Sequence, residues 1–169
     1  MTTLKDMTEK DLENVTKWRN DPDINRYLTL RVRTKDEADF WFKRSKSNRK
    51  NWIKIILYDN KPVGYALVED VDMIRRKCEF VIIIGAKDLW GKGVGITVIK
   101  EMLKYCFEDL KLHRALAVID GGNKRSIKLF EKSGFIHEGT LRDAMYIDGQ
   151  FSDLLCYSML ENEYKALAT

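Results

Sequence analysis

Leu89-Trp90-Gly91-Lys92-Gly93-Val94-Gly95 separates a predicted strand from a predicted helix, and the rest of the chain is interpreted around this unit. Residues 78–84, just before it, are apolar and β-branched, which predicts a buried strand. After it, apolar side chains recur every three or four residues from 96 to 110, as on one face of a helix. A glycine turn that opens a helix presents unpaired N–H groups at the positive helix end, which favours a phosphate ligand.

Periodicity and turn residues predict the remaining elements on both sides of this unit. Asp59-Asn60-Lys61-Pro62 and Asp148-Gly149 are typical of hairpin turns, and Gly134 is typical of the residue after a helix. Thr8, with Asp11 three residues later, favours a capped helix start. The predicted strands are residues 4–7, 52–58, 63–68, 78–84, 115–119, 136–143 and 151–161, and the predicted helices are 9–20, 35–47, 96–110 and 123–133.

This order predicts an α+β fold: a mixed, mostly antiparallel sheet flanked by helices. The strand–helix units 80–110 and 115–133 would form its parallel portion. The 169 residues suit a single domain, 1–169, because neither a linker nor a repeat interrupts the pattern.

Composition restricts the function classes and the compartment. A net charge of +4 is too small for a typical nucleic-acid-binding surface. Neither a signal peptide nor an apolar run long enough for a membrane span is evident, so we expect a cytoplasmic protein without a membrane partner. Cys78, Cys106 and Cys156 lie in apolar segments and are expected to be buried thiols, whereas His113 and His137 are isolated, so no metal site is expected.

Three kinds of phosphate loop are candidates for the glycine segment. The dinucleotide pattern G-x-G-x-x-G fails because Ile96 stands where the third glycine belongs, and the chain has no G-x-x-x-x-G-K-[ST] motif. Gly-Lys-Gly-Val-Gly therefore remains, either as another phosphate loop or as a tight turn without a ligand.

The segment Trp90–Gly95 resembles the R/Q-x-x-G-x-G/A acetyl-CoA motif of the GNAT acyltransferase superfamily, with Trp in the first position. Asn123-Lys124-Arg125-Ser126 and residues 129–135 (Leu-Phe-Glu-Lys-Ser-Gly-Phe) resemble a second signature of that superfamily. Residues 18–22 (Trp-Arg-Asn-Asp-Pro) are similar to the branch that acetylates ribosomal-protein N-termini. Residues 75–80, 138–141 and 148–150 are more similar to spermidine N-acetyltransferases.

The resemblance implies a GNAT fold in which a central parallel strand pair splays apart around the pantetheine arm of acetyl-CoA. It implies backbone contacts to that arm from Ile83 and Ile84 and phosphate contacts from the glycine loop. It also implies that Asn123 hydrogen-bonds the arm, with helix capping as the alternative role. The residues expected at acetyl-CoA are Ile83, Ile84, Trp90, Gly91, Lys92, Gly93, Val94, Gly95, Asn123, Ser126, Lys128 and Phe130.

Acetyl transfer to a primary amine needs a base, because a free alkylammonium has a pKa of about 10.4. Glu79, on the strand that leads into the loop, is the candidate base, directly or through water, and a structural glutamate is the alternative. The resemblance assigns Ser126 as a proton donor to the departing thiolate. Alternatively, Ser126 is an ordinary helix residue and the thiolate leaves unassisted.

The predicted acceptor is a protein N-terminus or small amine, and a polyamine such as spermidine is the alternative. A non-catalytic CoA-binding regulatory module is the alternative of another class. The exposed edge of the C-terminal hairpin is a candidate for pairing two subunits. Because the acceptor amine carries a positive charge before it reacts, we expect acidic side chains around it. The acids in segments that flank the acceptor side in relatives are Asp21, Asp23, Asp36, Glu37, Asp143 and Asp148.

Overall fold

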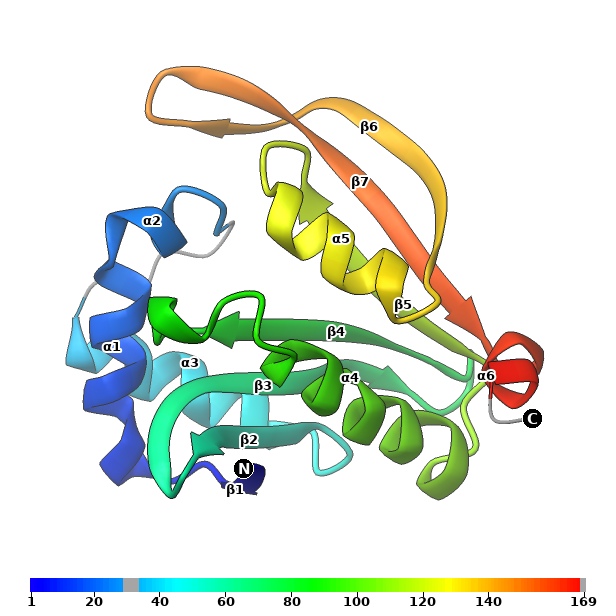
Figure 1. Ribbon diagram of the computed structural model, residues 1–169, viewed down its shortest axis with the longest axis horizontal. Helices are drawn as coiled ribbons and strands as arrows, with labels where there is room; N and C mark the ends of the chain where they lie inside the picture. The colour runs from blue at the N-terminus through cyan, green and yellow to red at the C-terminus, as the bar shows by residue number, and fades with distance from the viewer. Residues whose placement is uncertain (29–33, 168–169) are drawn as a thin grey trace.

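A mixed sheet is the framework of the molecule (Figure 1), and the computed structural model describes residues 1–28 and 34–167. Within those residues seven strands pair in the order β1-β2-β3-β4-β5-β7-β6. Each neighbouring pair is antiparallel except β4 and β5, which are parallel as predicted. The strands are β1 (Thr2–Asp6), β2 (Trp52–Tyr58), β3 (Lys61–Asp72), β4 (Lys77–Ile84), β5 (Arg114–Asp120), β6 (Ile136–Ile147) and β7 (Gln150–Leu160).

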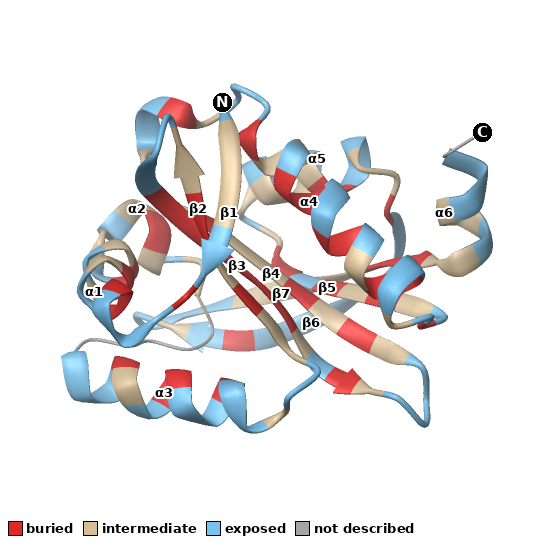
Figure 2. Ribbon diagram, turned by 90° about the horizontal axis from the view of Figure 1, so that it is seen from below, coloured by how far each residue is buried: buried red, intermediate tan, exposed pale blue. Residues whose placement is uncertain are grey.

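Helices cover both faces of the sheet, and Figure 2 shows α3 and α4 on opposite sides of it. One face carries α1 (Leu12–Asn20), α2 (Pro22–Asn25) and α3 (Lys35–Ser47). The other face carries α4 (Val94–Lys104) and α5 (Lys124–Lys132), while α6 (Glu161–Leu167) follows the last strand. Short helical turns stand at Glu9–Asp11, Lys87–Leu89 and Tyr105–Asp109.

The described residues form two apolar cores, one on each face of the sheet. Strand β4 contributes to both because successive side chains of a strand point to opposite faces. Its Cys78 and Phe80 pack toward α4 and α5, whereas Ile83 packs in the core beneath α1 and α3. Trp41 and Phe42 of α3 are buried in this second core.

Most predicted turns and caps are confirmed. Thr8 and Asp11 form a capping box before α1. Asp148 and Gly149 both have positive φ in the β6–β7 turn, as a tight hairpin requires. Gly134 has φ 90° just after α5, where its lack of a Cβ permits the left-handed conformation.

Several predicted boundaries are wrong. The helix predicted over 96–110 begins at Val94 and passes into a π-helical turn after Lys104, which periodicity alone does not distinguish from continued α-helix. The strand predicted to include Glu161 ends at Leu160, and Glu161 begins α6. Strand β3 extends beyond the predicted 63–68 because its pairing continues through the polar residues Glu69 and Asp72. Strand β6 extends beyond the predicted 136–143 because Met145, Tyr146 and Ile147 also pair with β7.

Two of the three cysteines are buried as predicted, and Cys156 is half-buried. The Sγ atoms of Cys78 and Cys106 lie 3.4 Å apart and join β4 to the π-helical turn. No helix within residues 1–28 and 34–167 is long and apolar enough to cross a membrane.

Candidate functional site

Strands β4 and β5 separate soon after they meet, and this divergence creates the site. In the described structure they share three residue pairs: Lys77 with Arg114, Cys78 with Ala115, and Glu79 with Leu116. Beyond Glu79, β4 pairs with β3 alone as far as Ile84. Strand N–H and C=O groups point alternately to the two edges, so the groups of residues 80–84 that face β5 are left without a ladder partner there.

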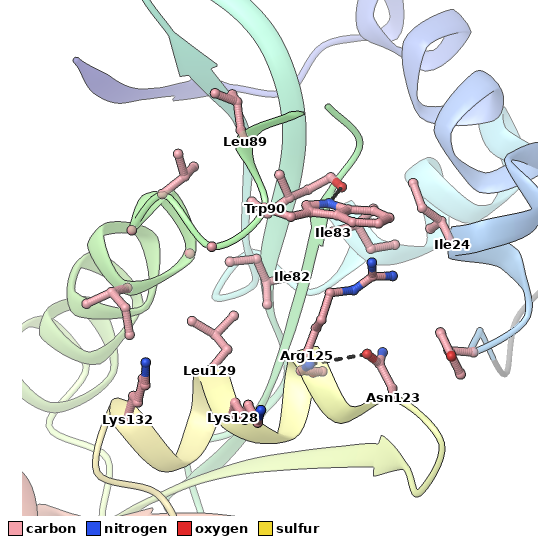
Figure 3. Close-up of a pocket in the computed structure, with 18 of the residues that line it drawn as sticks. Ile24, Ile82, Ile83, Leu89, Trp90, Asn123, Arg125, Lys128, Leu129 and Lys132 are labelled. Carbon is pink, nitrogen blue, oxygen red and sulfur yellow. Dashed lines mark hydrogen bonds between the residues drawn. The ribbon is translucent and has the colours of Figure 1, made fainter. Parts of the chain in front are cut away.

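A cavity of about 420 Å³ opens where the strands diverge (Figure 3). The end of β4 forms its floor, the segment that leads into α4 forms one wall, and α5 forms the opposite wall. Asp23 and Ile24 of α2, with Tyr27 and Leu28 after it, close the remaining side. The lining residues predicted from sequence are Ile83, Ile84, Trp90, Gly91, Gly93, Val94, Gly95, Asn123, Ser126 and Lys128.

The glycine loop turns its backbone toward this cavity. Gly91 and Gly93 have φ of 79° and 83°, and a Cβ at either position would meet no atom within 4 Å, so the left-handed backbone rather than crowding favours glycine. A Cβ at Gly95 would lie 2.9 Å from Leu129 Cδ2, so this glycine lets α4 and α5 pack closely. Within the described residues, the N–H groups of residues 93–96 donate to no backbone acceptor. The start of α4 can therefore bind an anion.

Trp90 fixes the loop to the strand and to the opposite wall. Its Nε1 donates a hydrogen bond to the carbonyl oxygen of Ile84 at 2.8 Å. The guanidinium carbon of Arg125 lies 3.4 Å from the centre of the Trp90 ring, so a side chain of α5 crosses the cavity to the loop (Figure 3).

Asn123 begins α5 as its cap, since its side-chain oxygen accepts from the Ser126 N–H at 3.2 Å (dashed in Figure 3). It also lines the cavity, so its position is compatible with both roles considered from sequence. Arg125 and Lys132 line the same wall and were not among the predicted site residues. Their spacing of three and four residues around Lys128 is the signal that could have identified them.

Glu79 occupies the apex of the divergence, as the last β4 residue paired with β5. It does not line the cavity; it lies on the opposite face of β4 from Cys78 and Phe80, beside its β3 partner Glu69. Burial, followed by the charge of Asp70, raises the pKa of Glu79. Burial and the neighbouring charges of Asp70 and Glu79 raise the pKa of Glu69 to about 7.

Two predicted acetyl-CoA contacts do not line the cavity. Lys92 is exposed outside the lining, and Phe130 is 2% exposed in the core, where its ring meets Phe135 at 5.0 Å. Of the six predicted acceptor-side acids, Asp23 alone is in the lining. Lys87 bridges it to Asp21 at 2.6 and 2.7 Å, so these two carboxylates share a lysine.

No group of three or more His, Cys, Asp or Glu side chains suited to a metal ion occurs in the part of the chain that the structure describes. The cavity lining combines backbone amides, apolar side chains and the cations of α5 with the polar side chains of Asn123 and Ser126 and the carboxylate of Asp23.

Comparison with known proteins gives consistent findings. The family model described as "Acetyltransferase (GNAT) domain" matches residues 2–136. The putative ribosomal N-acetyltransferase YdaF of Bacillus subtilis is 34% identical over 110 residues, which are 65% of this chain and 60% of that protein. Acetyltransferase PseH of Campylobacter jejuni is 29% identical over 80% of this chain and 85% of its own. The crystal structure of spermidine N-acetyltransferase from Vibrio cholerae in complex with CoA and spermine superposes with a TM-score of 0.87. It is 25% identical and covers 97% of this chain and 98% of its own.

Proposed function

Because this chain belongs to the acetyltransferase (GNAT) family, we propose that it transfers acetyl from acetyl-CoA to a primary amine. The observation that carries the proposal is the conjunction of two features at one cavity: the open N–H groups at the start of α4 and the unpaired edge of β4. The pyrophosphate of CoA suits the open N–H groups at the start of α4. Its pantetheine arm carries two amides, which suit the unpaired edge of β4.

Different residues along the cavity would bind different parts of acetyl-CoA. Gly93, Val94 and Gly95 would hold the pyrophosphate, and the β4 backbone at Ile83 and Ile84 would hydrogen-bond the arm. The bound thioester supplies the acyl group. A backbone N–H of β4 that faces the divergence is available to stabilise negative charge on the acyl oxygen.

Glu79 would act as the base from the apex of the divergence. An attacking amine must first lose a proton, and a carboxylate whose pKa is raised by burial is a stronger proton acceptor than an exposed one. Since Glu79 is outside the cavity lining, the proton would reach it through an intervening water. The amine nitrogen would then form the C–N bond as the C–S bond breaks.

Ser126 is the candidate proton donor to the thiolate, since it lines the cavity one turn into α5, and its hydroxyl would regain the second proton that the nitrogen releases as the amide forms. Ser126→Ala tests this role, because Asn123 can cap the backbone N–H of an alanine equally well. A lower kcat with unchanged KM for acetyl-CoA would support the role. Undiminished turnover would mean that the thiolate leaves without this hydroxyl.

The acceptor we propose first is a protein N-terminus or a small amine with one positive charge. A polyamine offers several ammonium groups, which favour several unpaired carboxylates. Among the described acids near the cavity, Asp21 and Asp23 are already paired with Lys87. The resemblance to YdaF over 110 residues is consistent with this preference.

A polyamine remains the second candidate because of the structural likeness to a spermidine N-acetyltransferase. Thiol release from acetyl-CoA, measured with spermidine, spermine and short peptides that begin with Ala or Ser, separates the two. Turnover on peptides alone supports the first candidate, and turnover on polyamines supports the second. CoA binding without turnover on any amine would favour a regulatory binding module.

We also infer that two subunits pair through β6, an edge strand of the sheet. Twelve residues long, it carries exposed apolar side chains, among them Ile136, Leu141 and Tyr146. Such an edge is a template for pairing, and a lysine in place of one of these apolar side chains would weaken the contact between subunits. Sedimentation of the wild type and of Leu141→Lys should give a dimer and a monomer, respectively. A monomeric wild type would refute the inference.

A further inference from the structure

The wall of the cavity formed by α5 carries three cationic side chains, in addition to the open N–H groups at the start of α4. Arg125, Lys128 and Lys132 all line the cavity, at spacings of three and four residues that place them on one helix face. Within residues 1–28 and 34–167, none of the three forms an ion pair with a carboxylate.

Nearby carboxylates are engaged elsewhere. Asp23, across the cavity, is held by Lys87 and Arg26. Glu131, in the same helix, accepts a hydrogen bond from the Tyr157 hydroxyl at 2.9 Å. The wall therefore presents cations to the cavity without nearby compensation, and such a wall attracts an anion.

These cations flank the start of α4. The close approach of Leu129 to Gly95 sets the two helices side by side, and Figure 3 shows Lys128 and Lys132 on either side of Leu129. Arg125 stands at the other end of the row, against Trp90. A ligand whose pyrophosphate lies on residues 93–96 thus has a second cationic surface within the same cavity.

We propose that Lys128 and Lys132 bind the 3′-phosphate of CoA, so that the protein discriminates CoA from 3′-dephospho-CoA. The Arg125 guanidinium, which lies against the Trp90 ring, adds a third positive charge to this wall. This inference rests on the proposed function, since it assumes that the cavity binds CoA. A phosphate monoester carries between one and two negative charges near neutral pH and is the group by which the two ligands differ. Lysine ammonium groups are well suited to it as point charges.

Isothermal titration of the protein with acetyl-CoA and with acetyl-3′-dephospho-CoA tests this inference without relying on turnover. The wild type should bind acetyl-CoA at least about tenfold more tightly, as expected when charge-assisted contacts are lost. The double variant Lys128→Ala/Lys132→Ala should lose that preference by weakening acetyl-CoA alone. Lys100→Ala/Lys124→Ala is the matched control, because it removes two exposed helix lysines outside the cavity lining.

Three results would overturn the inference. Equal wild-type affinities for the two ligands would do so, as would equal weakening of both ligands in the Lys128/Lys132 variant, or loss of the preference in the control. In each of these cases CoA still binds, so the proposed function stands. If neither ligand binds the wild type, the proposed function itself fails.

Discussion

The Trp90 ring is held on two sides: the Arg125 guanidinium carbon lies 3.4 Å from its centre, and its Nε1 donates to the Ile84 carbonyl oxygen at 2.8 Å. The ring therefore joins α5, the glycine loop and the end of β4 at one point. In the family motif that this loop resembles, the first position is Arg or Gln. Here an indole fills that position, and an arginine reaches it from the opposite wall.

Trp90→Phe should loosen this junction. Phenylalanine keeps an aromatic face for Arg125 but removes the donor to Ile84, at a cost of about 1 kcal/mol in the free energy of unfolding. The KM for acetyl-CoA should rise because the loop is less well fixed. Urea denaturation and steady-state kinetics measure both effects, with Trp52→Phe as the control, since Trp52 stacks on Tyr105 outside the cavity lining. Equal effects from the two substitutions would contradict a specific role for Trp90.

Gly93→Ala should weaken binding of acetyl-CoA. At φ 83° an alanine is strained by about 1–2 kcal/mol, and the loop can relieve that strain only by turning its N–H groups away. Gly139→Ala is a close control because a Cβ there also meets no atom within 4 Å but its φ is not positive. Titration calorimetry should show weaker binding for Gly93→Ala and unchanged binding for the control. Unchanged binding in both would remove the loop backbone from the binding site.

Glu79→Gln should lower kcat by about a hundredfold, the smaller end of what general base catalysis contributes. In the wild type, the rate should rise with pH through a carboxylate pKa that burial has moved above its usual range. The variant should lose that part of the profile. Initial rates between pH 5 and 9 measure both properties, and an intact rate with an intact profile would exclude Glu79 as the base.

Glu69→Gln should stabilise the protein at alkaline pH. The pKa of Glu69 is raised to about 7 in the folded protein, so the folded state binds more protons than the unfolded state between the ordinary value, near 4.5, and 7. Wild-type stability therefore falls as pH rises through this window. After allowance for partial exposure, the variant should gain roughly 2 kcal/mol at pH 8 and little at pH 4. Urea denaturation at both values checks this, and a gain that does not depend on pH would contradict the assignment.

Local patterns predicted most of the architecture. The glycine loop, the hairpin turns and the helix caps depend on residues close together in the chain, so they could be inferred from sequence. The four-residue helix α2 escaped prediction, since it is too short for periodicity; Asp21 caps it and Pro22 starts it. The π-helical turn after Lys104 preserves the apolar spacing, so it resembled continued α-helix.

The site was harder to predict where it depends on distant contacts. The pairing of Glu69 with Glu79 is set by the β3–β4 register, which no local pattern specifies. Arg19 is 5% exposed, with its guanidinium over the Trp41 ring, and this burial depends on tertiary contacts because arginine is rarely buried. Lys132 reaches the cavity because α5 packs against α4, a contact that no local pattern specifies.

The short ladder between β4 and β5 has a consequence for how stable the protein is. In the described structure the two halves of the sheet are joined by three residue pairs, so the sheet is incomplete along residues 80–84 of β4. A ligand with amide groups, bound between the diverging strands, would hydrogen-bond the β4 backbone where no neighbouring strand pairs with it. Ligand binding then stabilises the folded state. At a free ligand concentration of a hundred times the dissociation constant, it adds about 2.7 kcal/mol to the free energy of unfolding. The melting temperature of this protein should accordingly report how much acyl donor surrounds it.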